Sequence, residues 1–303
     1  MNRISSVALV ALFLLGCGGV VRQAAWSEGA TVVTAPAGLG PRAREQREGL
    51  MTQAATAWAA RGDESQVRAA IHAWEAALEI DPTRTDDWAM LARAYYFLAD
   101  AHLSFNDGDR AEMIAAYHRG ALAAEQGLLQ SSPTFAARMR AGSTIEDQLN
   151  LLDTRDVPCM YWRAVNLGRW AALQGGGTAR EYGPETRAMM ARVLDLNANY
   201  YYGGAYRFFG ELYARWSPSA GGDLNRARAN FEQALRIAPN YLAPRVLIAE
   251  GVAVKARTRD VFDEQLHAVL FSTANTDPEL GPENAAEQRR ARRLIDTAPV
   301  LFR

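Results

Sequence analysis

The chain has 303 residues, with 33 lysines and arginines against 34 aspartates and glutamates, so its formal net charge is −1. Charges this evenly balanced give no strongly positive surface, which argues against a protein that binds nucleic acid through phosphate contacts. Only two cysteines are present, Cys17 and Cys159, and this number excludes a fold held together by a disulfide framework.

The first sixteen residues have the pattern of a targeting segment. One basic residue, Arg3, precedes a nine-residue apolar run from Val7 to Leu15. A membrane-spanning helix needs about 20 apolar residues, so residues 1–16 are predicted to be a signal peptide. The run ends in Leu14-Leu15-Gly16-Cys17, which resembles the lipobox of bacterial lipoproteins. The resemblance implies that Cys17 carries lipid as the first mature residue; the alternative is an ordinary secretory signal with a chance cysteine.

The residues after Cys17 bear on location. Two or three acyl chains anchor a protein stably, so we expect a periplasmic protein held to a bacterial membrane through lipid. An aspartate directly after the lipidated cysteine favours retention in the inner membrane. This chain has Gly18 at that position instead, which slightly favours the outer membrane. From Gly18 to Pro41 the sequence is rich in Gly, Ala, Ser, Thr and Pro and shows no periodicity. Residues 17–41 are therefore predicted to be a lipidated flexible tether.

The rest of the chain, residues 42–303, is predicted to be one all-α domain. Apolar residues recur at helical spacing, and no stretch alternates as a strand does. About a dozen helices are expected, with turns at residues 61–63, 81–82, 106–108, 175–177, 197–199, 217–222, 238–239 and 277–278. The segment from Ser131 to Asp156 is the least regular and is predicted to be a helix-loop insertion.

Two stretches of the domain resemble each other. Ala70, Trp74, Ala77 and Pro82 have the same spacing as Ala227, Phe231, Ala234 and Pro239. This spacing is typical of the second helix and closing turn of a tetratricopeptide repeat. Because the repeats are unevenly spaced, we predict an irregular tetratricopeptide-like helical repeat array, an α-solenoid that is either an open superhelix or a closed helical body.

Signatures of catalysis, metal binding and phosphate binding are missing from the sequence. There is no Gly-x-Ser-x-Gly motif, and the four histidines do not have His-Glu-x-x-His spacing. The run Gly175 to Gly177 lacks the Lys-Ser/Thr ending of a phosphate loop, and Thr178 is predicted to be a helix N-cap. We therefore expect no enzyme, no metal and no cofactor. Cys159 is predicted to be a buried small apolar residue, with a reactive thiol as the alternative.

Two aromatic-rich blocks, residues 159–170 and 200–210, are the strongest candidates for a binding site. Helical spacing places their aromatic rings beside polar side chains that would need partners if buried. A ring-lined cavity with few polar groups is a common site for small ligands. The candidate cavity residues are Tyr161, Trp162, Asn166, Arg169, Trp170, Tyr201, Tyr202, Tyr206 and Arg207. The alternative is that these aromatic residues are ordinary core.

The last predicted helix begins with acidic residues and continues into four arginines, Arg289, Arg290, Arg292 and Arg293. Acidic residues near the start of a helix and basic residues near its end complement the helix dipole. We therefore expect a solvated face, with a site for an acidic partner as the alternative.

Several stretches together resemble the T component family of tripartite ATP-independent periplasmic (TRAP) transporters, lipoproteins often called TatT. The resemblance lies in Tyr161–Trp170, Tyr200–Gly210, Gly221–Leu224, Ala238–Leu242, Ala249–Lys255 and Glu283–Arg293. It extends from about Trp74 to Leu294 and is more specific than the repeat spacing.

The resemblance implies a periplasmic helical scaffold that binds the solute-binding protein of a TRAP transporter. It also implies self-association, for which a trimer is one option, and a cavity for a small apolar ligand. A second hypothesis stays open, because tetratricopeptide lipoproteins also act as assembly factors for outer-membrane or pilus proteins.

Overall fold

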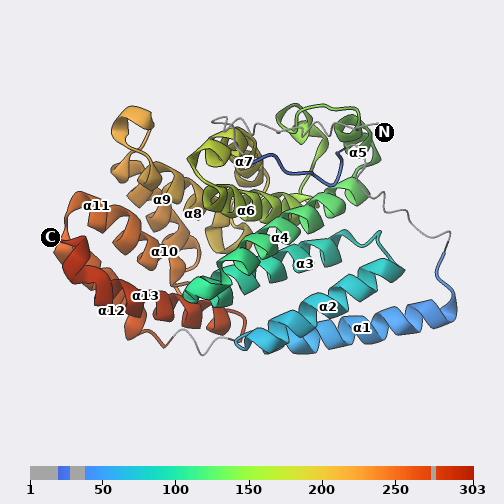
Figure 1. Ribbon diagram of the computed structural model, residues 1–303, viewed down its shortest axis with the longest axis horizontal. Coiled ribbons are helices and arrows are strands. Elements are labelled where there is room, and N and C mark those ends of the chain that lie inside the picture. Colours follow the sequence, from blue (N-terminus) through green and yellow to red (C-terminus); the bar gives the residue numbers. More distant parts are fainter. Residues whose placement is uncertain (1–19, 28–37, 274–277) are drawn as a thin grey trace, which may run out of the picture.

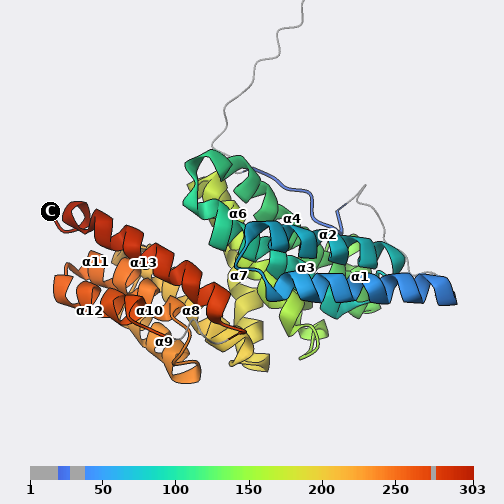
Figure 2. The ribbon, with the colours of Figure 1, turned by 90° about the horizontal axis from the view of Figure 1, so that it is seen from below.

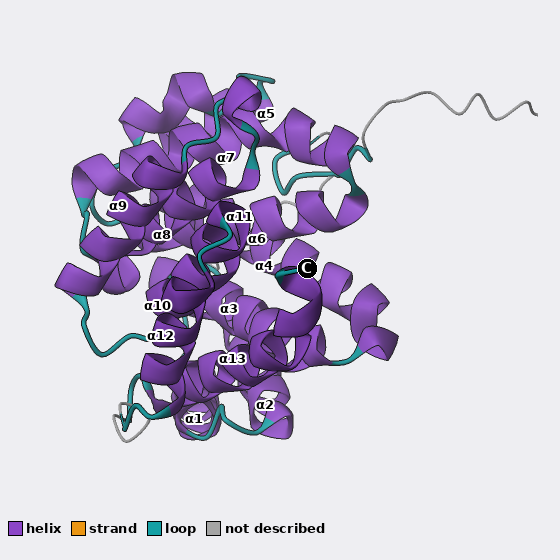
Figure 3. Ribbon diagram, turned by 90° about the vertical axis from the view of Figure 1, so that its left-hand side faces the viewer, coloured by secondary structure: helices purple, strands orange, loops and turns teal. Residues whose placement is uncertain are grey.

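The computed structural model describes residues 20–27, 38–273 and 278–303, and all regular structure among them is helical (Figure 3). The helices are α1 (Pro41–Ala59), α2 (Glu64–Ile80), α3 (Thr85–Phe97), α4 (Arg110–Ser131), α5 (Pro133–Arg140), α6 (Val157–Gln174), α7 (Gly176–Leu196), α8 (Tyr200–Arg215), α9 (Leu224–Ile237), α10 (Ala243–Leu247), α11 (Val254–Ala256), α12 (Arg259–Leu270) and α13 (Gly281–Leu301). The all-α prediction is confirmed, whereas the tetratricopeptide-like repeat stays a prediction. The predicted signal peptide, residues 1–16, and Cys17 and Gly18 lie outside the described residues.

Side-chain caps fix where several helices begin. The Asp63 carboxylate accepts a hydrogen bond from Ser65 N at 2.7 Å, and Asp223 caps α9 in the same way. Ser132 caps α5 inside the predicted insertion, which also contains a short 3₁₀ helix, Glu146–Leu151. Such caps accept hydrogen bonds from the first amide groups of a helix, which have no partner within the helix. Short polar residues at these positions therefore fix where the helix begins.

Consecutive helices pack side by side along an elongated body. Helices α1 to α4 lie at one end and α9 to α13 at the other, with α6 and α7 between them (Figures 1 and 2). Two helices widen locally into π-turns: α3 continues into Leu98–His102, and α10 continues into Ile248–Ala253. π-turns in proteins often occur at functional sites; the first of these borders the cavity described below, and both border a second space that adjoins it.

Small residues let α4 and α6 approach closely. A Cβ atom at Gly120 would lie 2.5 Å from Asn166 Oδ1, and one at Gly127 would lie 2.4 Å from Cys159 Sγ. Cys159 is buried, and burial raises the pKa of its thiol, so the group is neutral at physiological pH. These contacts agree with the prediction of a buried apolar role for Cys159.

Residues 20–27 lie within the segment predicted to be a flexible tether, and the structure places them on the helical body instead. Trp26 packs edge-on against Phe135 of α5, with ring centroids 6.0 Å apart. Val20 N donates a hydrogen bond to Thr178 Oγ1 at 2.8 Å. Thr178 therefore is not an N-cap; it lies inside α7, which begins at Gly176, and its hydroxyl group holds the N-terminal segment.

The arginines of α13 are also placed differently from the prediction. Arg290 Nη2 lies 3.0 Å from Asp100 Oδ2 in the π-turn of α3, and Arg289 donates to the backbone oxygen of Ala101. Near the start of α13, Glu283 pairs at 2.8 Å with both Arg61 and Arg93. The prediction of a solvated face is therefore wrong for Arg289 and Arg290, because this side of α13 packs on the π-turn that follows α3.

The contact between α8 and α9 gives a test of the packing. A Cβ atom at Gly210 would lie 2.4 Å from the ring of Phe231, which is fully buried. We expect Gly210→Ala to lower the free energy of unfolding by about 1–3 kcal/mol, because overpacking forces the ring to move. Urea unfolding followed by circular dichroism measures this change.

Gly168→Ala is the matched control, because Gly168 is also inside a helix but has open space around its Cβ position. This substitution should raise stability by about 0.4–1 kcal/mol, since alanine restricts the unfolded chain. Equal urea midpoints for the two variants would contradict the packing described here.

Candidate ligand cavity

The first turn of α8 contains a left-handed segment at Tyr201, Tyr202 and Gly203, with φ values of 44°, 59° and 70°. Glycine adopts this conformation easily, but it costs about 1–2 kcal/mol for each of the two tyrosines. Non-glycine residues in this region are uncommon and often mark functional sites. The turn directs the Tyr201 ring towards Tyr161 and Trp162, with ring centroids 5.5 and 4.6 Å away.

Arg207, one turn further along α8, stabilises the left-handed segment. Its guanidinium donates to the backbone oxygens of Tyr201, at 2.9 Å, and Tyr202. It also lies over the ring of Tyr241, 4.6 Å from the centroid. A hydrogen bond from a charged donor contributes about 1.5–3 kcal/mol, so two of them offset the strain of the two tyrosines.

The aromatic blocks border a cavity of about 300 Å³ between α3, α6, α7, α8 and α13. Seven aromatic side chains line it: Tyr96, Tyr161, Tyr182, Tyr201, Phe208, Trp216 and Tyr241. A second space of about 390 Å³ extends towards α9 and the π-turn at Ile248–Ala253. Both spaces are bordered by Asp100, Arg169, Glu211, Arg215, Leu247 and Arg290. The two spaces adjoin each other, and charged side chains line the boundary between them.

Four of the nine predicted cavity residues line this cavity: Tyr161, Arg169, Tyr201 and Arg207. Tyr161 fits because Gly204 has no side chain; a Cβ atom there would lie 2.4 Å from the tyrosine ring. Arg169 pairs with Glu211 of α8 at 3.0 Å. Both aromatic blocks thus contribute to one cavity, which helical spacing within each block could not show.

The other five predicted residues, Trp162, Asn166, Trp170, Tyr202 and Tyr206, are not among the residues that line the cavity. The Trp162 side chain is buried and donates to the hydroxyl group of Tyr200 at 3.1 Å. Asn166 is fully buried and donates to the backbone oxygens of Ala92 and Trp162.

Trp170 packs against His118 and Tyr182, whereas Tyr202 packs against Tyr201 and Tyr241. Tyr206 is partly exposed on α8. For Trp162, Asn166 and Trp170 the alternative of ordinary core therefore describes the geometry better.

Sequence reasoning missed several lining residues that come from other helices. Asp100 lies in a π-turn, Glu287 and Arg290 lie on α13, and Tyr182 and Arg187 lie on α7. The four-residue spacing of Arg207 and Glu211 could have indicated one more cavity residue. No pattern in the sequence indicated Asp100 or Arg290, because their proximity depends on the packing of α3 against α13.

The charged part of the cavity centres on Arg290. It lies 3.0 Å from Asp100 and 3.1 Å from Glu287. Burial is the largest single effect and would raise the pKa of Asp100, but Arg290, Arg169 and the hydrogen bond from Tyr117 together outweigh it, so the pKa is lowered. For Glu287 burial is the larger effect, and its pKa is raised. Burial also raises the pKa values of Tyr96, Tyr161 and Tyr201, so these tyrosines are neutral at physiological pH.

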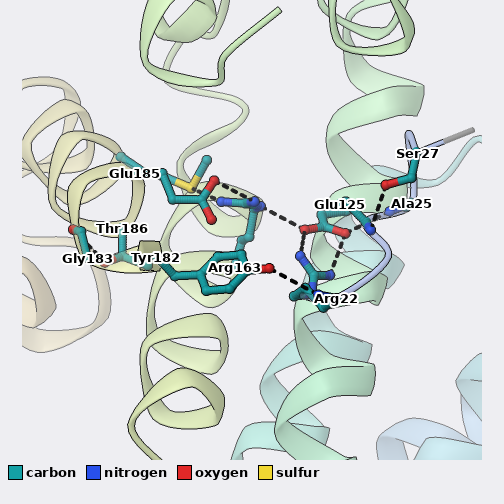
Figure 4. A network of polar contacts seen from close by, with 11 residues as sticks. Arg22, Ala25, Ser27, Glu125, Arg163, Tyr182, Gly183, Glu185 and Thr186 are labelled. Carbon is teal, nitrogen blue, oxygen red and sulfur yellow. Dashed lines mark hydrogen bonds and ion pairs between the residues drawn. The ribbon is translucent and has the colours of Figure 1, made fainter. Parts of the chain in front are cut away.

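A second buried network lies behind the α7 wall of the cavity and holds the N-terminal segment (Figure 4). The Glu125 carboxylate accepts two hydrogen bonds from Arg22, at 2.6 and 2.8 Å, and one from Arg163 at 3.0 Å. Arg22 N donates to the hydroxyl group of Tyr182 at 3.0 Å. Because Tyr182 also lines the cavity, one side chain joins the network to the cavity wall.

The residues that line the cavity are arranged to bind a ligand. Aromatic rings and aliphatic side chains line part of the space, and six arginines and three carboxylates line the rest of it. Among residues 20–27, 38–273 and 278–303 no group of three or more His, Cys, Asp or Glu side chains could hold a metal ion. In the same part of the chain no helix has the length and apolar character needed to cross a membrane.

The fold and the cavity define a class: an all-helical protein built around an internal, tyrosine-lined cavity. The family follows from sequence comparison. A family model described as TAtT, the TRAP transporter T-component, matches residues 94–302, and the chain belongs to this family. By its description, the T component is a transport-associated component, and the family is not one of enzymes.

One curated relative is described as an uncharacterized protein of Treponema pallidum (strain Nichols). It is 28% identical over 188 residues, which are 59% of this chain and 56% of the relative. The chain thus spans little more than half the length of the relative that it matches.

Arg207→Met tests whether the guanidinium stabilises the left-handed turn. The variant leaves two backbone oxygens without their donors, and each unsatisfied acceptor costs about 1–3 kcal/mol. We therefore expect stability to fall by about 2–4 kcal/mol and the near-ultraviolet tyrosine signal to weaken. Arg228→Met is the matched control, because Arg228 pairs only with Glu232 on the exposed side of α9 and should cost about 0.5 kcal/mol or less. Similar urea midpoints for both variants would contradict the role of Arg207.

Glu125 gives a prediction on pH. Burial alone would raise its pKa, but Arg22 and Arg163 outweigh burial and hold it below the ordinary value of 4.5. A lowered pKa means that the ionised carboxylate stabilises the fold fully above about pH 4.5 and that this contribution is lost as the pH falls. Hydrogen exchange, corrected for intrinsic rates, should show protection of the Arg22 and Ala25 amides that decreases below this pH. In Glu125→Gln the protection should be low at every pH, and an unchanged profile would refute the prediction.

Proposed function

We propose that the protein is a lipid-anchored periplasmic scaffold that binds the solute-binding protein of a TRAP transporter and holds a small apolar ligand in its tyrosine-lined cavity. The observation that carries the ligand part is the cavity itself. Seven aromatic side chains from five separate parts of the chain line one space, and a strained turn at Tyr201 and Tyr202 helps to form it.

The lipid anchor is supported by the sequence Leu14-Leu15-Gly16-Cys17. Acylation of Cys17 holds the body at the periplasmic face of a membrane, in the same compartment as the solute-binding protein. Confinement in this way raises the effective concentration of a docking surface towards its partner. Gly18 favours the outer membrane, and we retain that assignment as part of the proposal.

The solute-binding protein is proposed as the partner because the chain belongs to the T component family. A helical body that holds a small ligand can exchange that ligand with a second binding protein on contact. The competing hypothesis, an assembly factor for outer-membrane or pilus proteins, needs a groove for extended client peptides. An internal cavity of about 300 Å³ fits a small ligand better than a peptide segment.

Gly168→Trp tests the ligand cavity. Gly168 lines the cavity, and a Cβ atom there would meet no other atom within 4 Å, so a large side chain fills the space without disturbing the core. We expect at least a tenfold loss of affinity for an apolar fluorescent probe such as Nile red. Fluorescence titration of the purified protein measures the affinity.

Gly49→Trp is the matched control, because Gly49 lies in α1, is exposed and also has open space around its Cβ position. This variant should bind the probe as the unsubstituted protein does. Equal probe affinity in the two variants would rule out the cavity as the binding site.

The partner is tested by recovery of complexes from membranes. The full-length lipoprotein, with a C-terminal affinity tag, is captured from cells that are shown to express a TRAP solute-binding protein. Recovery of that protein supports the proposal. Its absence, together with altered surface-protein assembly and normal solute uptake after deletion of the gene, supports the assembly factor instead.

A further inference from the structure

Residues Val20–Ser27, which we call the N-terminal strap, are fixed to the body by side chains of α4 and α7. Three of their backbone amides donate to body side chains: Val20 N to Thr178 Oγ1 at 2.8 Å, Arg22 N to the Tyr182 hydroxyl at 3.0 Å, and Ala25 N to Glu125 Oε2 at 2.9 Å. Hydrogen bonds to side chains that are distant in the sequence therefore hold the strap on the body.

The side chain of Arg22 strengthens this attachment. It is almost completely buried and forms two hydrogen bonds to Glu125, which Arg163 also contacts. Bidentate arginine–carboxylate pairs are among the strongest side-chain hydrogen bonds. Removing Arg22 leaves Glu125 paired with Arg163, so the strap can be weakened without leaving a buried carboxylate unpaired.

The strap begins only three residues after Cys17. Three residues span at most about 11 Å, so the first turn of α7 lies close to the position that carries lipid in the proposed function. A flexible tether from Cys17 to Pro41 would instead give a root-mean-square separation of about 25–30 Å. Because the strap is fixed to the body, the connection between Cys17 and the helical body is much shorter than a flexible tether would make it.

The surface beside this position is apolar. Val20 is 49% exposed and Val21 is 78% exposed; Gln23 is exposed as well, whereas the other residues of the strap are buried or half-buried. Burial of a valine side chain in an apolar phase contributes about 1.5–3 kcal/mol. Two exposed valines next to acyl chains are well placed to enter the same lipid layer.

We propose that the strap docks the body on the membrane in one orientation, with the start of α7 against the lipid. This inference rests on the proposed lipid anchor at Cys17. Tyr182, Ala179 and Arg180 of α7 border the cavity, so the docked orientation turns the α7 wall of the cavity towards the membrane. Helix α13 lies on the opposite edge of the body from α7 and the strap (Figure 1).

The orientation is tested with the full-length, lipidated protein in vesicles of phosphatidylethanolamine and phosphatidylglycerol that contain spin-labelled lipid. A fluorescent label is attached at Gly176→Cys, the first residue of α7, or at Arg292→Cys, an exposed position on α13. Cys159 is buried and is left unchanged. We expect the spin-labelled lipid to quench the label at residue 176 several-fold more than the label at residue 292.

Arg22→Ala and Thr178→Val then test the strap. Each removes one attachment, and quenching at residue 176 should fall towards the value at residue 292. Far-ultraviolet circular dichroism and urea unfolding confirm that each variant is folded. Equal quenching at the two positions, or quenching at residue 176 that is unchanged in both folded variants, would overturn the inference.

Mass spectrometry of the N-terminal peptide separates failure of the anchor from failure of the orientation. An unmodified Cys17 would overturn the lipid anchor and this inference with it. An acylated Cys17 with equal quenching at both labels would overturn the orientation alone and leave the anchor in place.

Discussion

Three buried or partly buried carboxylates, each paired with at least one arginine from a distant part of the chain, connect the helical body. Glu125 contacts Arg22 and Arg163, and Glu283 contacts Arg61 and Arg93. Asp100 completes the set with Arg290. Removing a carboxylate from water is unfavourable unless its oxygens are paired, so each pair persists only while the helices around it stay in place. The consequence is that the N-terminus, the middle and the last helix are bound into one body.

The cavity depends on the same constraint. Arg290 reaches Asp100 across the cavity, and Arg169 reaches Glu211 beside it. These pairs occupy polar groups that would otherwise face the ligand space without partners. Arg207 stabilises the backbone in the same region. Its hydrogen bonds keep Tyr201 and Tyr202 in a left-handed conformation that residues with side chains disfavour. A protein that only needed packing at this place would form a regular helix, so the retained strain supports a role for the cavity.

The sequence and the structure agree best where local rules apply. The all-α prediction holds because helical periodicity is a property of each segment by itself. The prediction that Cys159 is buried agrees with the structure, since a cysteine without a disulfide partner in an apolar stretch usually packs as a small apolar residue. The aromatic blocks were informative in part: Tyr161, Arg169, Tyr201 and Arg207 line the cavity, whereas Trp162 and Asn166 face the core. Helical spacing identifies a face of a helix but not which neighbour covers it.

The predictions that failed concern charges and loops. The arginines of α13 look solvated in the sequence because the acids that pair with them lie far away along the chain, Asp100 foremost. The strap looks flexible because its composition is that of a linker and Glu125, its main partner, is 103 residues from Arg22.

The sequence by itself determined the helical class, the likeness to a lipoprotein signal at Cys17 and the family to which the chain belongs. Tertiary structure alone decided which rings share a cavity, which arginines are buried and where residues 20–27 lie. The physical reason is that periodicity and motifs are local, whereas pairing a buried charge requires a partner that only the packing of distant helices brings within 3 Å.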